Sequence, residues 1–112
     1  MSIPVCPTCA TPAATHPAGW CLDAWVHKYI MGGKGEAPEY STDIASGMQV
    51  WRKMVEEGYW WALEADGEGC FVRILTGQHY VFRAEANVNE EQLAICRAAL
   101  MAKAGESDGK SK

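Results

Sequence analysis

Four side chains with the chemistry of metal ligands lie close together near the start of the chain. They are Cys6, Cys9, His16 and Cys21, in the pattern C-x2-C-x6-H-x4-C. A Cys-x2-Cys pair is typical of zinc knuckles, and thiolate and imidazole are the donors that zinc takes in a tetrahedral site. The spacing predicts a structural zinc site, because four protein ligands leave no open position for a substrate.

Two other interpretations of this stretch stay open. Residues 1–18 hold four of the five prolines, and a proline ring forbids a helix interior, so the segment is an irregular arm in which the ligand types could be incidental. The Cys6–Cys9 pair could instead be redox-active. That motif normally opens a helix after a strand, and Pro7 and Pro12 argue against such a helix.

The remaining reactive residue types form no marked catalytic set. Cys70 and Cys96 fall on apolar faces of a predicted strand and helix, which is typical of buried free thiols. A nucleophilic cysteine would need a histidine and an orienting group beside it, and His79 at a turn is more simply a solvated side chain. No pair of carboxylates is marked for acid–base work. We therefore expect that the protein is not an enzyme.

The pattern of apolar residues predicts two helices before the first strand. The first follows residue 19 and ends at Gly32, where glycine readily adopts a left-handed conformation. The second is capped by Ser41 or Thr42 and ends at Gly58. Gly47 within the second helix costs helix propensity, so we expect another element to approach closely there.

A third helix has the clearest start. Asn89 is predicted to cap it, with Gln92 at the third helical position and a contact between Val88 and Leu93. Gly105 is the predicted stop. The polar residues 106–112 are predicted to be a disordered tail.

Three runs of alternating residues predict a small sheet between the second and third helices. They are YWWALEA from residue 59, CFVRIL from residue 70 and HYVFRA from residue 79. Their short, glycine-containing links favour antiparallel neighbours. Because both faces carry aromatic or aliphatic residues, both need cover. We predict an α+β domain over residues 19–105, with a three-stranded antiparallel sheet, helices on both faces and the order ααβββα.

The five tryptophans divide into two groups. Trp25, Trp51 and Trp61 fall on the apolar stripes and are predicted to lie in the core. Trp20 and Trp60 lie off those stripes. Trp60 either covers the second face of the sheet under a helix or, with Trp20 and Tyr59, binds a partner, since Trp and Tyr concentrate binding energy at interfaces.

Charge and hydropathy narrow the class of protein. The net charge is −4 and Lys and Arg form no block, so binding to nucleic acid is not expected. No apolar run is long enough to span a bilayer, and the first residues do not resemble a signal peptide. We expect a protein of the host-cell cytoplasm, where an odd count of five cysteines does not indicate disulfides.

Three segments resemble the phage ABA sandwich domain family. They are LDAWVHKYIMGG from residue 22, PEYSTDIASGMQVWRKM from residue 38 and EQLAICRAALMAKA from residue 91, within a resemblance that covers roughly residues 19–104. The resemblance implies an α/β/α sandwich and a phage or prophage source. It implies no activity and carries over no catalytic residue.

The predicted function is therefore binding rather than catalysis. We expect a phage or prophage accessory protein that binds a host or phage protein through an aromatic surface with an acidic rim. One alternative is a small structural-zinc module that contacts nucleic acid through its N-terminal arm, although Lys28 and Lys34 are the only basic residues nearby. Another alternative is a small-molecule or nucleotide binder.

Overall fold

The computed structural model describes residues 5–65, 67–75 and 81–110. The predicted α+β class and three-stranded antiparallel sheet are confirmed, with the strands in the order β1-β2-β3. The α-helices and strands follow one another as ααβββα, after a short 3-10 helix that was not predicted. His79 and Tyr80 lie outside the described residues. The elements are η1 (Ala13–Thr15), α1 (Trp20–Tyr29), α2 (Ile44–Glu56), β1 (Trp60–Ala65), β2 (Cys70–Leu75), β3 (Val81–Ala86) and α3 (Glu91–Lys110).

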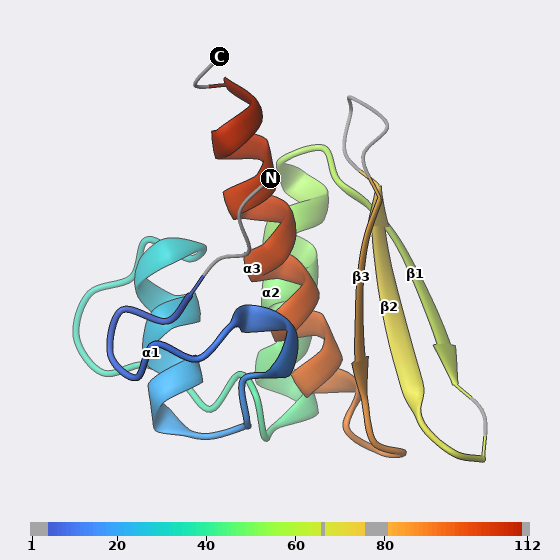
Figure 1. Ribbon diagram of the computed structural model, residues 1–112. Coiled ribbons are helices and arrows are strands. Elements are labelled where there is room, and N and C mark those ends of the chain that lie inside the picture. The colour runs from blue at the N-terminus through green and yellow to red at the C-terminus, as the bar shows by residue number, and fades with distance from the viewer. Residues whose placement is uncertain (1–4, 66, 76–80, 111–112) are drawn as a thin grey trace.

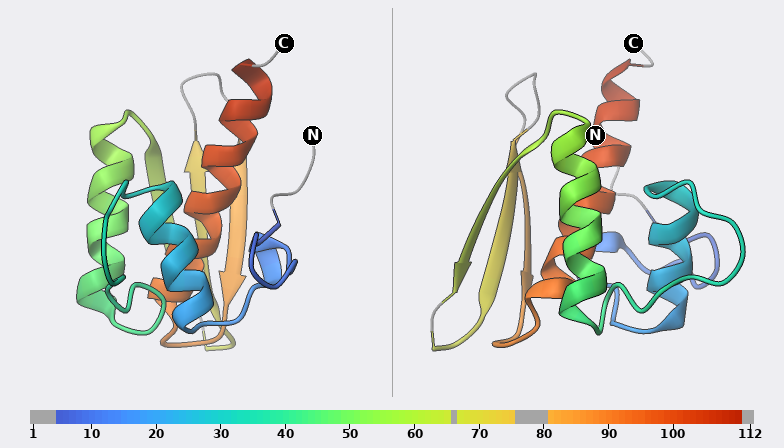
Figure 2. Two further views of the ribbon diagram at one scale, coloured as in Figure 1. Left: turned by 90° about the vertical axis from the view of Figure 1, so that its left-hand side faces the viewer. Right: turned by 180° about the vertical axis from the view of Figure 1, so that it is seen from behind.

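The layering differs from the predicted sandwich. The described helices all lie on one side of the sheet, with α2 and α3 against it and α1 and the N-terminal arm behind them (Figures 1 and 2). The order of layers is thus sheet, helix pair, then α1 with the arm. The prediction of helices on both faces is wrong for the described part of the chain.

The outer face of the sheet is charged enough to face water. Arg73 forms an ion pair with Glu64 at 3.0 Å, and Arg83 forms one with Glu85 at 3.0 Å. The Arg83 guanidinium also lies over the Phe71 ring, 4.1 Å from its centroid, so the ring is partly shielded without a helix. Trp60 is exposed on the same face, so the interpretation that a helix covers it is wrong.

The inner face of the sheet supplies the core. Ile74 pairs across the sheet with Trp61 and Phe82, and Val72 pairs with Ala84, so β2 is buried along its length on this side. The buried residues of α3 pack onto β2 and β3. Cys70 and Cys96 are buried free thiols, as predicted. Burial raises the pKa of both thiols, which keeps them protonated and unreactive.

Local contacts determine where α2 begins and how closely it packs against α3. Asp43, rather than Ser41 or Thr42, caps α2 by accepting from the backbone N–H of Ser46 at 3.2 Å. The predicted close approach at Gly47 is confirmed, since a Cβ there would lie 2.7 Å from the Gln92 Cβ of α3.

The third helix differs from its prediction at both ends. Asn89 has a φ of +66° and lies before α3, which begins at Glu91, so it is not the cap. The helix continues past Gly105 to Lys110 and takes in most of the predicted tail. Within the described residues, none of the helices combines the length and the apolar character needed to cross a membrane.

Candidate metal centre

A tight turn in the arm brings the first two sulfur atoms together. The Cys6 N–H donates to the Thr11 carbonyl at 3.0 Å, and the Ala10 N–H donates to the Cys6 carbonyl at 2.9 Å. A bridge between Val5 and Pro12 closes the base of the turn. The side chains of Cys6 and Cys9 therefore meet on one side of a short closed loop.

The next segment returns the chain to this loop. His16 directly follows η1, and Cys21 lies in the first turn of α1. Gly19 precedes that helix with a φ of +145°, a conformation that favours glycine, and its N–H donates to the Ser41 Oγ at 3.0 Å. This sharp entry into α1 turns the Cys21 side chain toward the arm, although it stands at the start of a helix.

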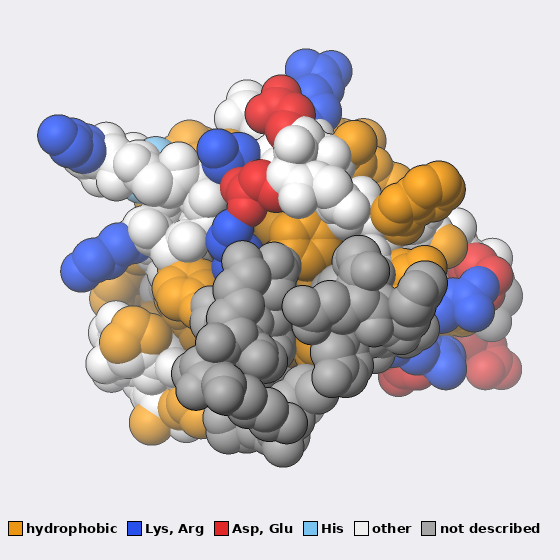
Figure 3. Space-filling model, turned by 90° about the horizontal axis from the view of Figure 1, so that it is seen from above, with side chains coloured by type: hydrophobic (Ala, Val, Ile, Leu, Met, Phe, Trp, Pro, Cys, Tyr) orange, Lys and Arg blue, Asp and Glu red, His pale blue; other side chains and the backbone are white. Residues whose placement is uncertain are grey.

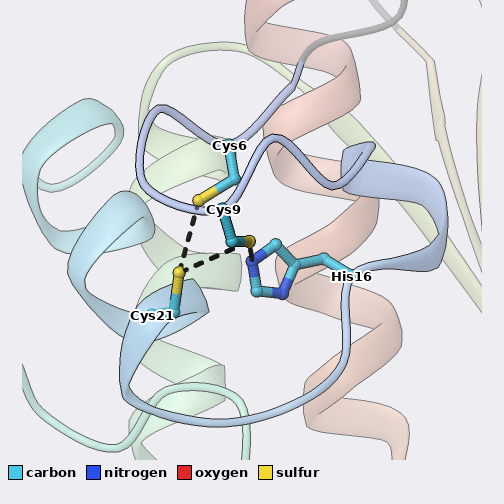
Figure 4. A group of neighbouring side chains, drawn as sticks. All are labelled: Cys6, Cys9, His16 and Cys21. Carbon is cyan, nitrogen blue, oxygen red and sulfur yellow. Dashed lines mark hydrogen bonds between the residues drawn. The ribbon is translucent and has the colours of Figure 1, made fainter.

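The four side chains converge on one point (Figure 4). The Sγ atoms of Cys6 and Cys21 are 3.4 Å apart and those of Cys9 and Cys21 are 3.7 Å apart. The Cys9 Sγ is 3.2 Å from His16 Nε2, and the four ligand atoms all lie within 4.8 Å of one another. Tetrahedral zinc with its usual bond lengths spaces two sulfur ligands by about 3.8 Å and a sulfur and a nitrogen ligand by about 3.6 Å. The cluster can hold a metal ion.

A second contact fixes the ring of His16. Its Nδ1–H donates to the Pro17 carbonyl at 2.7 Å, because a carbonyl oxygen can only accept. In the neutral imidazole this leaves the lone pair on Nε2, the atom that faces Cys9. Histidine ligands of metals are commonly oriented by such a hydrogen bond from the other nitrogen. His16 is only 2% exposed, and its ring centroid lies 6.1 Å from that of Trp25, so packing also restricts it.

The turn favours thiolate at its two cysteines. Burial alone would raise the pKa of Cys6, but hydrogen bonds from the backbone N–H groups of Cys9 and Thr8, with those of nearby side chains, lower it below its ordinary value. Hydrogen bonds from the side chain and backbone of Thr11 lower the pKa of Cys9 to about 6. Thiolate is the form of cysteine that binds metal.

The pKa values of the other two members, Cys21 and His16, are raised, so both residues keep their protons more readily. Burial and the neighbouring thiolates raise the pKa of Cys21 to about 12. Burial opposes a charge on His16, but its hydrogen bond to the Pro17 carbonyl and the thiolates of Cys6 and Cys9 raise its pKa. A divalent cation would take the place of these protons, since it supplies the positive charge that the thiolates attract.

Arg97 of α3 ties the arm to the rest of the fold. Its Nε–H donates to the His16 carbonyl at 2.8 Å, and a terminal N–H donates to the Glu85 carbonyl of β3 at 2.7 Å. No sequence motif indicates this role, because Arg97 lies 81 residues from His16 along the chain. The one signal that could have found it is a charged arginine within an otherwise apolar stretch of helix.

The three residues predicted to bind a partner lie in different surroundings. Trp20 and Trp60 are each 74% exposed, whereas Tyr59 is 5% exposed. Trp20 stands next to the ligand Cys21 at the start of α1, and Trp60 begins β1. The structure does not bring these three side chains into one patch with the metal centre.

Comparisons with protein-family models, curated proteins and solved structures found no match to this chain.

Proposed function

We propose that Cys6, Cys9, His16 and Cys21 bind one zinc ion, which has a structural role. The observation that carries this proposal is the convergence of four ligand atoms within 4.8 Å, together with the hydrogen bond that orients His16. Three soft thiolates and an imidazole, at separations near those of a tetrahedral site, favour zinc over the harder cations that prefer oxygen. All four positions are filled by protein, so the ion has no position for a reacting group.

The proposed ion would fasten the N-terminal arm to α1. The arm supplies Cys6, Cys9 and His16, and α1 supplies Cys21, so the ion would cross-link these two segments. Cys6 and Ala13 of the arm are buried against the core. Without the ion, four polar ligand groups would crowd together with unfavourable charge.

Metal analysis tests this directly. The protein should be purified without a histidine tag and its zinc measured by mass spectrometry, with about one ion per chain expected. Cys9→Ser should lose the metal, and the control Thr8→Ser, an exposed residue of the same turn, should keep it. Wild-type protein that carries no zinc, and gains none on titration, would overturn the proposal.

We infer that the zinc-stabilised chain acts by binding a protein with basic groups. Trp20 is exposed beside a hollow of about 490 Å³ that is also lined by the exposed residues Glu36 and Glu39. An exposed indole with carboxylates around it suits the stem and charge of a lysine or arginine side chain. This surface agrees with the aromatic contact and acidic rim expected of a phage or prophage accessory protein.

Affinity capture tests the binding role. The protein should retain a protein from a bacterial lysate, the retention should weaken as salt is raised, and Trp20→Ala should abolish it. The control variant Val88→Ala changes an exposed apolar residue in the turn between β3 and α3 and should leave capture intact. Capture that Trp20→Ala does not reduce would contradict this assignment of the surface.

A further inference from the structure

One edge of the sheet is open. Among the described residues β1 pairs only with β2, so its other edge presents unpaired backbone N–H and C=O groups. At the opposite edge, Arg97 donates to a backbone carbonyl of β3. Proteins usually protect an edge strand with proline, a bulge or inward-pointing charges. The sequence of β1, WWALEA, contains none of these, and its only charge points to the outer face.

An apolar stripe runs along α2 beside this edge. Helical spacing places Ile44, Met48, Trp51 and Val55 on one line, about a quarter turn from the buried residues of the same helix. Trp51 stacks on Trp61 of β1 with ring centroids 4.7 Å apart, whereas the other three side chains of the stripe are exposed. Figure 2 shows α2 beside β1, with α3 over the rest of the sheet.

The surface near the stacked rings is hollowed. One hollow of about 380 Å³ is lined by aromatic residues that include Trp51, Tyr59 and Trp60, and a second of about 250 Å³ adjoins it at Trp60 and Trp61. Figure 3 views the molecule from above the orientation of Figure 1. At this end, hydrophobic side chains (orange) reach the surface on the side where the sheet lies. The isolated chain thus leaves an aromatic hollow next to a free strand edge.

Two polar groups at this hollow lack partners within the described part of the chain. The Tyr59 hydroxyl and the Trp61 Nε1–H are buried, and neither forms a hydrogen bond with a described residue. An unsatisfied buried donor costs about 1–3 kcal/mol, so both groups favour a state in which an acceptor is supplied. These orphan groups indicate a surface that is completed by another molecule.

We propose that this surface pairs with a second copy of the chain. The β1 strands of two copies would run antiparallel across a two-fold axis and join their sheets into one of six strands. The α2 stripes of the two copies would then face each other across the same axis. Such an interface must be self-complementary, since each residue meets the same patch on the partner.

The sequence of β1 meets this requirement. In an antiparallel pair, directly opposite residues point to the same face of the sheet. The two-fold axis must therefore lie where one residue faces the same residue of the other copy, not midway between two successive residues. With the axis at Ala62, Glu64 lies opposite Trp60 of the other copy, and with the axis at Leu63 it lies opposite Ala62. In neither register do two glutamates oppose each other, so no like charges meet.

The exposed apolar area of this surface determines how tight the dimer is expected to be. The exposed side chains of Trp60, Leu63 and the α2 stripe offer on the order of 500 Å² of apolar surface per copy, or about 1,000 Å² in total, which is typical of weak complexes. We therefore expect a dimer with a dissociation constant of roughly 1–100 μM. The proposal depends on neither zinc nor the Trp20 surface.

Sedimentation equilibrium over a range of concentrations tests the proposal. The wild-type protein should shift from monomer to dimer with concentration. Trp60→Glu should weaken the dimer at least tenfold, whereas Trp20→Glu changes an equally exposed tryptophan on α1 and should not. Leu63→Lys, at 41% exposure, should act like the first variant, and Val88→Lys, at 47% exposure, like the second.

Two further measurements keep the result interpretable. Thermal unfolding should show that all four variants fold, as expected for changes at exposed positions. In a mixed sample with one labelled copy, filtered nuclear Overhauser spectra should show contacts between β1 strands near Ala62 and Leu63. A monomer at every concentration overturns the proposal. So does a dimer that Trp20→Glu weakens as much as Trp60→Glu, or a dimer that lacks these contacts.

Discussion

A single oxygen-for-sulfur exchange at Cys9 tests the metal centre with little damage to the core. Cys9 is exposed, and its sulfur contacts the side chains of Thr11, His16 and Cys21. Serine keeps the shape of the side chain but does not belong to the usual zinc ligands. Cys9→Ser therefore removes one of four ligands and leaves the packing of the domain unchanged.

The size of the effect follows from mass action. Zinc present at 1,000 times its dissociation constant stabilises the folded chain by about 4.1 kcal/mol. In a domain of this size 1 kcal/mol corresponds to about 4–8 °C in the melting temperature. We expect chelation of the wild-type protein to lower Tm by roughly 15–30 °C, and Cys9→Ser to lower it by a similar amount.

Circular dichroism melts with and without a strong chelator measure both effects. The chelator should have no further effect on Cys9→Ser, because that variant has already lost the ion, whereas Thr8→Ser should respond like the wild-type protein. If chelation changed the wild-type Tm by less than about 2 °C, the ion would not be fastening the arm. If Cys9→Ser kept the full response to chelator, Cys9 would not be a ligand.

Three other outcomes are expected. Arg97→Met should destabilise the fold by about 1.5–3 kcal/mol in urea unfolding, because the carbonyls of the arm and of β3 both lose a charged donor, whereas Arg52→Met on the exposed side of α2 should have little effect. Gly47→Ala should destabilise the fold by about 1–3 kcal/mol, because the new methyl group would clash with α3. In an isolated helix the same substitution would stabilise by about 1 kcal/mol, so an increase in Tm would contradict the close contact. Alkylation followed by mass spectrometry should label Cys9, whose pKa is lowered to about 6, only after chelation, and should label Cys96 only in denaturant, because burial raises its pKa; early labelling of Cys96 would show that the core is open.

The sequence predicts the elements better than their arrangement. Gly47 predicts a close approach that the structure contains, because a glycine weakens the middle of a helix unless a neighbouring element needs the space of its missing side chain. The layering is not predicted, because the apolar character of Phe71 and Trp60 on the outer face favours a helix over them. The structure instead shields Phe71 with Arg83, and this contact joins two strands whose register the sequence does not reveal.

The metal centre is also only partly predictable from the sequence. The types and spacing of its four ligands are visible in the sequence, since all lie within one short stretch. The entry at Gly19 that turns Cys21 inward depends on a backbone conformation, and the hydrogen bond that fixes His16 depends on the position of one carbonyl. Neither of these two features produces a periodic pattern in the sequence. The open edge of β1 is also invisible, because a strand sequence does not state whether it lies at the centre or the margin of a sheet.

The contact between Arg97 and the arm has a consequence for biosynthesis. The four proposed ligands leave the ribosome before α3 does, so an ion could be captured as soon as α1 has emerged. The surface on which the arm rests is made later, since it belongs to α3 and Arg97 lies 81 residues after His16. Capture of the proposed ion and docking of the arm would therefore be separate events, and a nascent chain would carry its metal on a tethered loop before the domain that will hold this loop exists.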